Sequence, residues 1–471
     1  MTISYENRSE CPMDKKIRCL FGTDGVRDVA NKGVMIPEMV LRLARAYALF
    51  LAERGVPRPK IAIGTDTRLS CQMLQCALEA GFMSAGADVM LLGVMPTAGV
   101  SFAVRHYNAT GGAVISASHN PAEYNGIKFF DRNGVKLSDD DEASIEEYLG
   151  DSMLDEWRPT GASIGRARDA FGAMEVYVKH MLSKAVALSL SEYKIVIDCA
   201  NGAMIEPARL VFSALNPKDM VFLGDEPNGI NINEGVGVMC IDTARDAVIR
   251  ECADFAVAFD GDGDRVLFVD RKGRVIDGDV IIWVLAKWLK KRGKLGGGVV
   301  ITMMSNMALE EHLKEEGITV YRCPVGDRYV YETMQRSDSM LGGEQSGHII
   351  VKEHVQTGDG LCTSLMFLQA CKELNLDIGE LVDEFSPYPQ MLKNVKVSNK
   401  EKVLSHPDFL RSLRECEDII KGKGRIFVRP SGTEPMVRIL LEAKGVDLKS
   451  IVEKLASDIQ RIDEELKNKV V

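Results

Sequence analysis

The sequence predicts an α/β protein made of three three-layer α/β/α units with mixed sheets and a smaller α+β unit at the C-terminus. Its 471 residues exceed the roughly 250–300 residues at which one hydrophobic core stops growing. Short apolar runs alternate with segments of helical spacing, which is typical of parallel or mixed sheets covered on both faces. The pattern changes after Pro387 and Pro389, which mark a linker.

The expected elements follow in chain order from apolar runs, helical spacing and turn residues. Residues 1–16 are polar and aperiodic, and we interpret them as a loose extension. The first unit has expected strands at 61–64, 88–93 and 113–116 and a helix at 70–86. The next two units have strands at 194–198, 255–259, 298–302 and 318–323, with helices at 208–215, 279–291 and 306–316. The last unit has strands at 393–397, 425–428 and 437–442.

Composition and charge exclude several classes of protein. Hydrophobic residues make up 46% and charged residues 27%, which excludes a disordered or fibrous chain. The 58 Lys+Arg against 68 Asp+Glu, a net charge of -10, disfavour a nucleic-acid-binding protein. The most apolar helical stretch, at 280–289, is too short for a membrane span, and residues 1–19 show no secretory signal. The eleven cysteines contain no CxxC pair, which favours a reduced, cytoplasmic setting.

Three aspartates, Asp260, Asp262 and Asp264, follow the expected strand at 255–259. Carboxylates at this spacing share one face of an extended backbone, where they repel one another unless a cation neutralises them. All-oxygen ligation favours Mg²⁺ or Mn²⁺. An EF-hand is excluded, because its loop needs Gly at position six and Glu at position twelve, which here are Arg265 and Arg271. The alternative is a solvated acidic turn.

A second motif, Ser116-Ala117-Ser118-His119-Asn120-Pro121, follows the expected strand at 113–116. Strand ends are where open α/β sheets bind ligands, so a hydroxyl beside His and Asn is a candidate nucleophile or phosphate acceptor. Lys128 follows shortly after and would offset phosphate charge. A Ser/Asn/Pro turn is an equally good explanation of this segment alone.

Two further loops carry polar groups suited to sugar and phosphate. The loop at 342–348 offers an acid, an amide, a hydroxyl and an imidazole, which suit sugar hydroxyls. The loop at 429–435 offers a guanidinium, hydroxyls and free N–H groups, which suit phosphate. A glycine-rich turn and a hairpin loop are the respective alternatives. The nucleotide signature GxxxxGK[ST] is absent from the sequence, so a phosphate-handling enzyme of this kind needs another phosphoryl donor, such as a phosphoserine.

Together the four motifs resemble the α-D-phosphohexomutase superfamily over the chain from about Leu20 onward. The segments 21–27 and 325–330 and the form of the 343–348 loop favour the branch that acts on glucosamine phosphates. The resemblance implies four domains around a central cleft. We place these domains at 17–165, 166–270, 271–385 and 386–471.

The resemblance also implies a role for each candidate residue. Ser118 would carry phosphate and hold one Mg²⁺ together with Asp260, Asp262 and Asp264. His119, Lys128 and Arg265 would act beside Ser118 in catalysis, with the proton-transferring group left open among His119, Lys128 and His348. The remaining implied residues would bind substrate: Arg27, Asp327, Arg328, Glu344, Ser346, His348, Arg429, Ser431, Gly432 and Thr433.

The implied reaction interconverts glucosamine 6-phosphate and glucosamine 1-phosphate through a 1,6-bisphosphate, which supplies UDP-N-acetylglucosamine synthesis for the cell envelope. The implied partner is a small sugar phosphate, with no nucleic acid or membrane, and a homodimer is expected by analogy. The alternatives are phosphoglucomutase/phosphomannomutase activity, a Mg²⁺-dependent sugar phosphatase and a non-catalytic sensor. The sensor is disfavoured because Ser118 and all three aspartates are present.

Overall fold

The computed structural model describes residues 20–22, 24–430 and 435–468. The chain divides into two compact units, one formed by residues up to Thr302 with Tyr321–Glu380 and the other by Met303–Val320 with Leu381–Val471. Three mixed sheets belong to the first unit and one antiparallel sheet to the second. This confirms the predicted fold class. Within the described ranges, no helix is long and apolar enough to cross a membrane.

The first sheet has six strands in the order β1-β5-β4-β2-β3-β6. Neighbouring strands among β4, β2, β3 and β6 are parallel, whereas β5 is antiparallel to both β4 and β1. The loop after β4 therefore lies beside the beginning of β5. The strands are β1 (Val26–Val29), β2 (Lys60–Thr65), β3 (Asp88–Val94), β4 (Gly111–Ile115), β5 (Tyr124–Phe130) and β6 (Ala167–Asp169).

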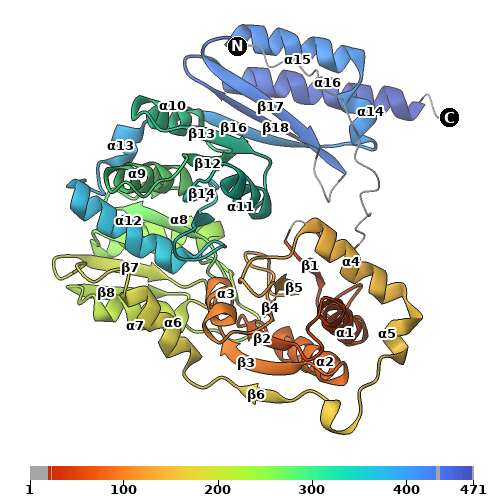
Figure 1. Cartoon of the computed structure of the whole chain (residues 1–471). Helices are drawn as coiled ribbons and strands as arrows, with labels where there is room; N and C mark the ends of the chain where they lie inside the picture. Colours follow the sequence, from red (N-terminus) through yellow and green to blue (C-terminus); the bar gives the residue numbers. More distant parts are fainter. Residues whose placement is uncertain (1–19, 23, 431–434, 469–471) are drawn as a thin grey trace. The chain divides into compact units, whose positions relative to one another are not determined.

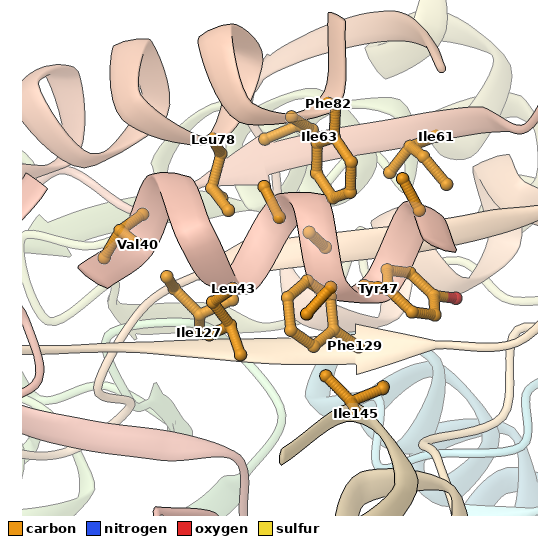
Figure 2. Close-up of a cluster of buried hydrophobic side chains, with 14 of the residues drawn as sticks. Val40, Leu43, Tyr47, Ile61, Ile63, Leu78, Phe82, Ile127, Phe129 and Ile145 are labelled. Carbon is orange, nitrogen blue, oxygen red and sulfur yellow. The ribbon is translucent and has the colours of Figure 1, made fainter. Parts of the chain in front are cut away.

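A large apolar core covers one face of this sheet (Figure 2). Tyr47 of helix α1 (Pro37–Glu53) has its ring near those of Phe82 of α2 (Ser70–Ser84) and Phe129 of β5, and Leu43 lies on the side of α1 that faces β5. The rings of Tyr47 and Phe129 have centroids 4.6 Å apart. Helices α4 (Asp139–Gly150) and α5 (Ser152–Glu156) pack beside α1.

Helix α3 (Thr97–His106) packs against β2 and β4 of the same sheet. A Cβ on Gly112 of β4 would lie only 2.6 Å from Val104 of α3, so this close approach requires glycine. Because α3 begins directly after β3, and β3, β2 and β4 run parallel, its N-terminus lies at the edge of the sheet where these strands end.

The second sheet has the order β11-β10-β9-β7-β8, with β7 parallel to β8 and β9, and β10 antiparallel to β9. The strands predicted at 194–198 and 255–259 are confirmed as β7 and β9. The strands are β7 (Lys194–Asp198), β8 (Asp219–Leu223), β9 (Phe255–Phe259), β10 (Val266–Asp270) and β11 (Val275–Ile276). The helices are α6 (Ala173–Leu182), α7 (Ile205–Ala214) and α8 (Ile241–Glu251).

The third sheet has the order β13-β12-β14-β15. Helices α9 and α11 lie on its opposite faces, because Gly343 of β14 faces Ile282 of α9 and the neighbouring Gly342 faces Val330 of α11. The strands are β12 (Val299–Thr302), β13 (Val320–Cys323), β14 (Leu341–Gly343) and β15 (Ile349–Val351). The helices are α9 (Gly278–Lys291), α11 (Asp327–Arg336) and α12 (Gly360–Leu374).

The second unit contains an antiparallel sheet in the order β16-β18-β17. Helices α15 and α16 pack on this sheet around a separate apolar core (Figure 1). The strands are β16 (Gln390–Lys396), β17 (Gly424–Pro430) and β18 (Met436–Ala443). The helices are α10 (Met307–Glu315), α13 (Leu381–Phe385), α14 (Lys400–Leu404), α15 (Pro407–Ile420) and α16 (Leu448–Asn468).

Candidate active site

Ser118 lies in the loop after β4, and its side chain meets the end of β9. Its Oγ donates a hydrogen bond to Asp260 Oδ2 at 2.5 Å, and the residue is buried. Its backbone is left-handed, with φ of 51°, which is uncommon for a residue other than glycine. The hydroxyl is therefore held at the carboxylates by an unusual local backbone conformation.

The three aspartates form one buried cluster in the loop between β9 and β10. One oxygen from each of Asp260, Asp262 and Asp264 lies within 4.8 Å of the others. Burial, together with the neighbouring charges of Asp264 and Asp262, raises the pKa of Asp260 well above its usual value. The buried Oδ1 of Asp262 has no hydrogen-bond partner among the residues that the structure describes. This all-oxygen set, with an acceptor left over and excess negative charge, fits a hard divalent cation.

Lys128 supplies part of the positive charge that these acids need. Its buried Nζ, on β5, lies 2.8 Å from Asp262 Oδ2, 3.3 Å from Asp264 Oδ2 and 3.1 Å from Asp24 Oδ2. Burial favours the neutral amine, but these three carboxylates outweigh it, and the pKa of Lys128 is raised well above its usual value. Lys128 is therefore an ammonium ion in this arrangement.

The first turn of α3 also binds the predicted metal loop, which is the segment at residues 260–264. Thr97 Oγ1 donates to Asp262 Oδ2 at 2.7 Å, and the Thr97 N–H donates to the Asp262 carbonyl oxygen at 3.0 Å. The loop of the second sheet is thus fixed to a helix that packs on the first sheet.

A chain of ion pairs continues from Lys128 to α11. Lys136 pairs with Asp24 and with Asp327. His348 lies between the carboxylates of Asp264 and Asp327, at 3.5 and 3.6 Å. Sequence reasoning identified neither Asp24 nor Lys136 as a functional residue, because the pairing partners are remote in the chain.

Three cationic or titratable residues border Ser118. His119 Nδ1 lies 3.4 Å from Ser118 Oγ, and burial together with Arg265 and Arg27 lowers the pKa of His119 to about 4. Arg27 pairs with Asp24, and its Nη1 donates to the Ala117 carbonyl at 3.5 Å. Burial disfavours the charged guanidinium of Arg265, but nearby carboxylates, first Asp260 and Asp264, raise its pKa. Ser118 therefore lies between two guanidinium groups, those of Arg27 and Arg265, and the carboxylates that balance them, and His119 is neutral beside it.

The predicted sugar loop connects β14 to β15 and runs next to the metal loop. Glu344 Oε1 accepts from the Gly326 N–H at 3.0 Å, and Ser346 Oγ donates to Glu344 Oε2 at 3.2 Å. An isolated bridge joins His348 to Arg265, so the metal loop and the sugar loop are neighbours in space.

The remaining residues predicted to bind substrate take no part in the interactions with Ser118 or the aspartates described above. Arg328 on α11 pairs with Asp139 and with Glu142 of α4, the latter at 2.7 Å. Its guanidinium is therefore engaged by two carboxylates of one helix, α4. Arg429 lies on β17 in the second unit. The predicted extension at 1–16 and the predicted phosphate-binding residues Ser431, Gly432 and Thr433 fall outside the described residues.

Comparison with known proteins places the chain in a family. Four family models match in succession: phosphoglucomutase/phosphomannomutase alpha/beta/alpha domain I at residues 18–154, domain II at 175–273, domain III at 277–388 and the C-terminal domain at 392–459. The fold and the site thus define a four-part α/β protein with a buried serine and aspartate centre. The chain belongs to the phosphoglucomutase/phosphomannomutase family.

Relatives with higher sequence identity share one name within this family. The phosphoglucosamine mutase of Pelotomaculum thermopropionicum is 46% identical over 446 residues, covering 94% of this chain and 99% of the relative. The phosphoglucosamine mutase of Geobacillus kaustophilus is 43% identical over 445 residues, covering 94% and 98%.

Solved structures share the fold at lower identity. A phosphoglucomutase/phosphomannomutase family protein of Burkholderia thailandensis has a TM-score of 0.77 at 21% identity, covering 94% of this chain and 97% of that one. N-acetylphosphoglucosamine mutase of Aspergillus fumigatus, solved in complex with GlcNAc-6P and magnesium, has a TM-score of 0.67 at 16% identity, covering 94% and 96%.

Proposed function

We propose that this chain is an isomerase, a phosphoglucosamine mutase that interconverts glucosamine 6-phosphate and glucosamine 1-phosphate. The substrate class is supported by relatives of that name at 43–46% identity over nearly the whole chain. The observation that carries the chemistry is the 2.5 Å hydrogen bond from Ser118 Oγ to Asp260 inside a buried carboxylate cluster. A serine hydroxyl held there is in place to carry a phosphoryl group.

We propose that Asp260, Asp262 and Asp264, with an oxygen of phosphorylated Ser118, hold one Mg²⁺. The donor set supports this, because all the ligands are oxygens and one buried Asp262 oxygen has no hydrogen-bond partner in the described part of the chain. When bound, the ion supplies positive charge that offsets the negative charge of the transferring phosphoryl group.

The chain's own residues would perform the transfer in two halves. The substrate O1 attacks the phosphorus on Ser118, the bond from phosphorus to Ser118 Oγ breaks, and glucosamine 1,6-bisphosphate forms. After the bisphosphate turns around, Ser118 Oγ attacks the 6-phosphate and glucosamine 1-phosphate leaves. Arg27, Lys128 and Arg265 would offset charge on the phosphoryl oxygens, while the choice of proton carrier stays open among His119, Lys128 and His348.

The remaining predicted residues have proposed roles in holding the sugar phosphate. Glu344, Ser346 and His348 would bind sugar hydroxyls, and Asp327 and Arg328 would also bind the substrate. Arg429, Ser431, Gly432 and Thr433 would bind the phosphate that is not being transferred. The domain boundaries at 17–165, 166–270, 271–385 and 386–471, a homodimeric assembly and a cytoplasmic location stay predictions, as does the supply of UDP-N-acetylglucosamine synthesis.

A side-by-side assay tests the proposed function. Purified enzyme with Mg²⁺ and a trace of the 1,6-bisphosphate should convert glucosamine 6-phosphate to the 1-phosphate faster than it converts glucose or mannose phosphates. Intact mass should show one phosphoryl group per chain. Faster conversion of hexose phosphates would favour phosphoglucomutase/phosphomannomutase activity, and release of inorganic phosphate without any 1-phosphate would favour a phosphatase.

The contact between Gly261 and the serine loop, the segment at residues 116–123 that carries Ser118, gives a further prediction. A Cβ on Gly261 would lie 2.7 Å from the Ser118 carbonyl oxygen and 2.9 Å from Asn233 Nδ2, so either loop has to move. A displacement near 1 Å typically costs about 10²-fold in rate, and we expect this loss of kcat in Gly261→Ala. Gly150→Ala is the control, because no atom lies within 4 Å of its new Cβ. Equal kcat for the two variants would show that the loops tolerate the shift.

A further inference from the structure

A completely buried arginine, Arg68, lies beneath the loop that carries Ser118. It follows β2 and belongs to none of the motifs that the sequence analysis singled out. Its guanidinium donates to four carbonyl oxygens of the serine loop and its exit. These acceptors are the carbonyls of Ser118 at 3.0 Å, Asn120 at 2.8 Å, Pro121 at 2.5 Å and Tyr124 at 3.0 Å.

Asp66 fixes the orientation of this guanidinium. Its Oδ2 accepts from Arg68 Nε at 2.9 Å and from Ser116 Oγ at 2.6 Å. Ser116 Oγ in turn accepts from the Ser118 N–H at 2.9 Å. Asp66 and Arg68, which follow β2, therefore form one closed hydrogen-bond network with the serine loop. In this network both the N–H and the C=O of Ser118 are bound.

A second donor reaches the same carbonyls from a different part of the fold. Asn233 Nδ2 donates to the Ser118 carbonyl at 2.9 Å and to the Asn120 carbonyl at 3.1 Å. Asn233 lies in the segment after β8 of the second sheet, and its own N–H donates to the Ala200 carbonyl at 2.8 Å. The serine loop is thus held by its own sheet and by the sheet that carries the aspartates.

These contacts have a specific geometric result. Ser118 has a φ of 51°, a conformation that side-chain-bearing residues avoid. Bound N–H and C=O groups on both sides of the residue keep it there. In this conformation Ser118 Oγ lies 2.5 Å from Asp260 Oδ2, whereas a relaxed φ would turn the hydroxyl away.

We propose that Arg68 and Asn233 are positioning residues, which bind the carbonyl oxygens of Ser118 and Asn120 and so hold the serine Oγ against the aspartate cluster. The inference rests on the proposed mutase function. Because both side chains bind backbone behind Ser118, their loss should lower kcat and leave the KM for glucosamine 6-phosphate unchanged.

Asn233→Gly is the sharper test. The φ of Asn233 is 60°, which glycine adopts readily, so the variant removes the amide donor without straining the backbone. We expect kcat to fall about 10- to 100-fold, KM to stay within about twofold, and hydrogen exchange of the peptide 116–124 to become at least about tenfold faster. Asn216→Gly is the matched control, because Asn216 is exposed, has a φ of 52° and lies away from the site.

Arg68→Lys tests the other donor, because one ammonium group cannot replace five N–H donors in a planar fork. We expect a larger loss of kcat than in Asn233→Gly, with the same unchanged KM. Should Arg68→Lys fail to fold, Asn233→Gly still decides the proposal.

Three results would overturn the inference: a kcat for Asn233→Gly equal to that of Asn216→Gly, faster exchange without loss of kcat, or a loss expressed mainly in KM. The wild-type rate, measured in the same assay, separates rejection of these positioning roles from rejection of the proposed mutase function. A wild-type chain without mutase turnover would reject the function, and the exchange data would still show whether the two donors hold the loop.

Discussion

Ser118→Ala is expected to lower mutase turnover by at least about 10⁴-fold, because the variant lacks the oxygen that accepts the phosphoryl group. The Ala side chain fits the loop, and loss of the hydrogen bond to the buried Asp260 carboxyl group costs about 1–3 kcal/mol. The thermal midpoint should therefore move by no more than about 4 °C. Steady-state kinetics measure the turnover, intact mass measures the phosphorylation, which should be absent, and thermal unfolding measures the midpoint, all on one preparation.

Ser183→Ala provides the control for this change. Ser183 is exposed at the end of α6, where its hydroxyl also makes a local hydrogen bond, to His180. It should keep full turnover and full phosphorylation. A phosphorylated Ser118→Ala chain, or one with near wild-type turnover, would show that another residue carries the phosphoryl group.

Asp262→Asn is expected to raise the Mg²⁺ concentration for half-maximal activity by at least about tenfold. The new amide has a similar shape but no charge. Asp262 Oδ2 accepts from Lys128 and Thr97, so the amide oxygen should take that position and turn its NH₂ group toward the cation. The fold should persist, because Lys128 still pairs with Asp24 and Asp264.

The measurement is activity as a function of Mg²⁺ concentration, with Asp242→Asn as the control. Asp242 has a side chain that is 79% exposed on α8, where it pairs with Arg245 of the same helix. An unchanged Mg²⁺ dependence in Asp262→Asn would remove this residue from the metal site. Full activity of the wild type after exhaustive chelation would reject the metal site altogether.

Sequence reasoning identified the metal loop and the serine loop because both follow strands that are apolar along their whole length. Strands β4 and β9 are fully buried, so their sequences lack polar residues and end abruptly in polar ones. Such a boundary is visible in the sequence, and the rule that ligands bind at strand ends supplies the chemistry.

The residues that sequence reasoning missed are those whose partners are remote in the chain. Lys136 and Asp327 are 191 positions apart, and Asn233 and Ser118 are 115 apart. A lone Lys or Asn carries no local signal of such a partner. Asp66 and Arg68 could have been predicted as candidate site residues, because they too follow an apolar strand, β2. They were not, because no recognisable motif surrounds them.

The apolar residues on both sides of the aspartates indicated strands in the sequence, but the range and direction of β10 were not predicted. In the structure the chain reverses there, and β10 returns antiparallel to β9. The glycines between the aspartates therefore lie in the turn that joins two antiparallel strands.

The sharing of charge between sheets has a consequence for the order of folding. The buried acids of the second sheet are balanced by Lys128 of the first, and Lys136 of the first sheet needs Asp327 from the third part of the chain. During synthesis the aspartate loop therefore reaches its low-energy state only after the first sheet exists. The ion-pair network is complete only once Asp327 and His348 have been added to the chain, so the charge balance of the site depends on three parts of the sequence.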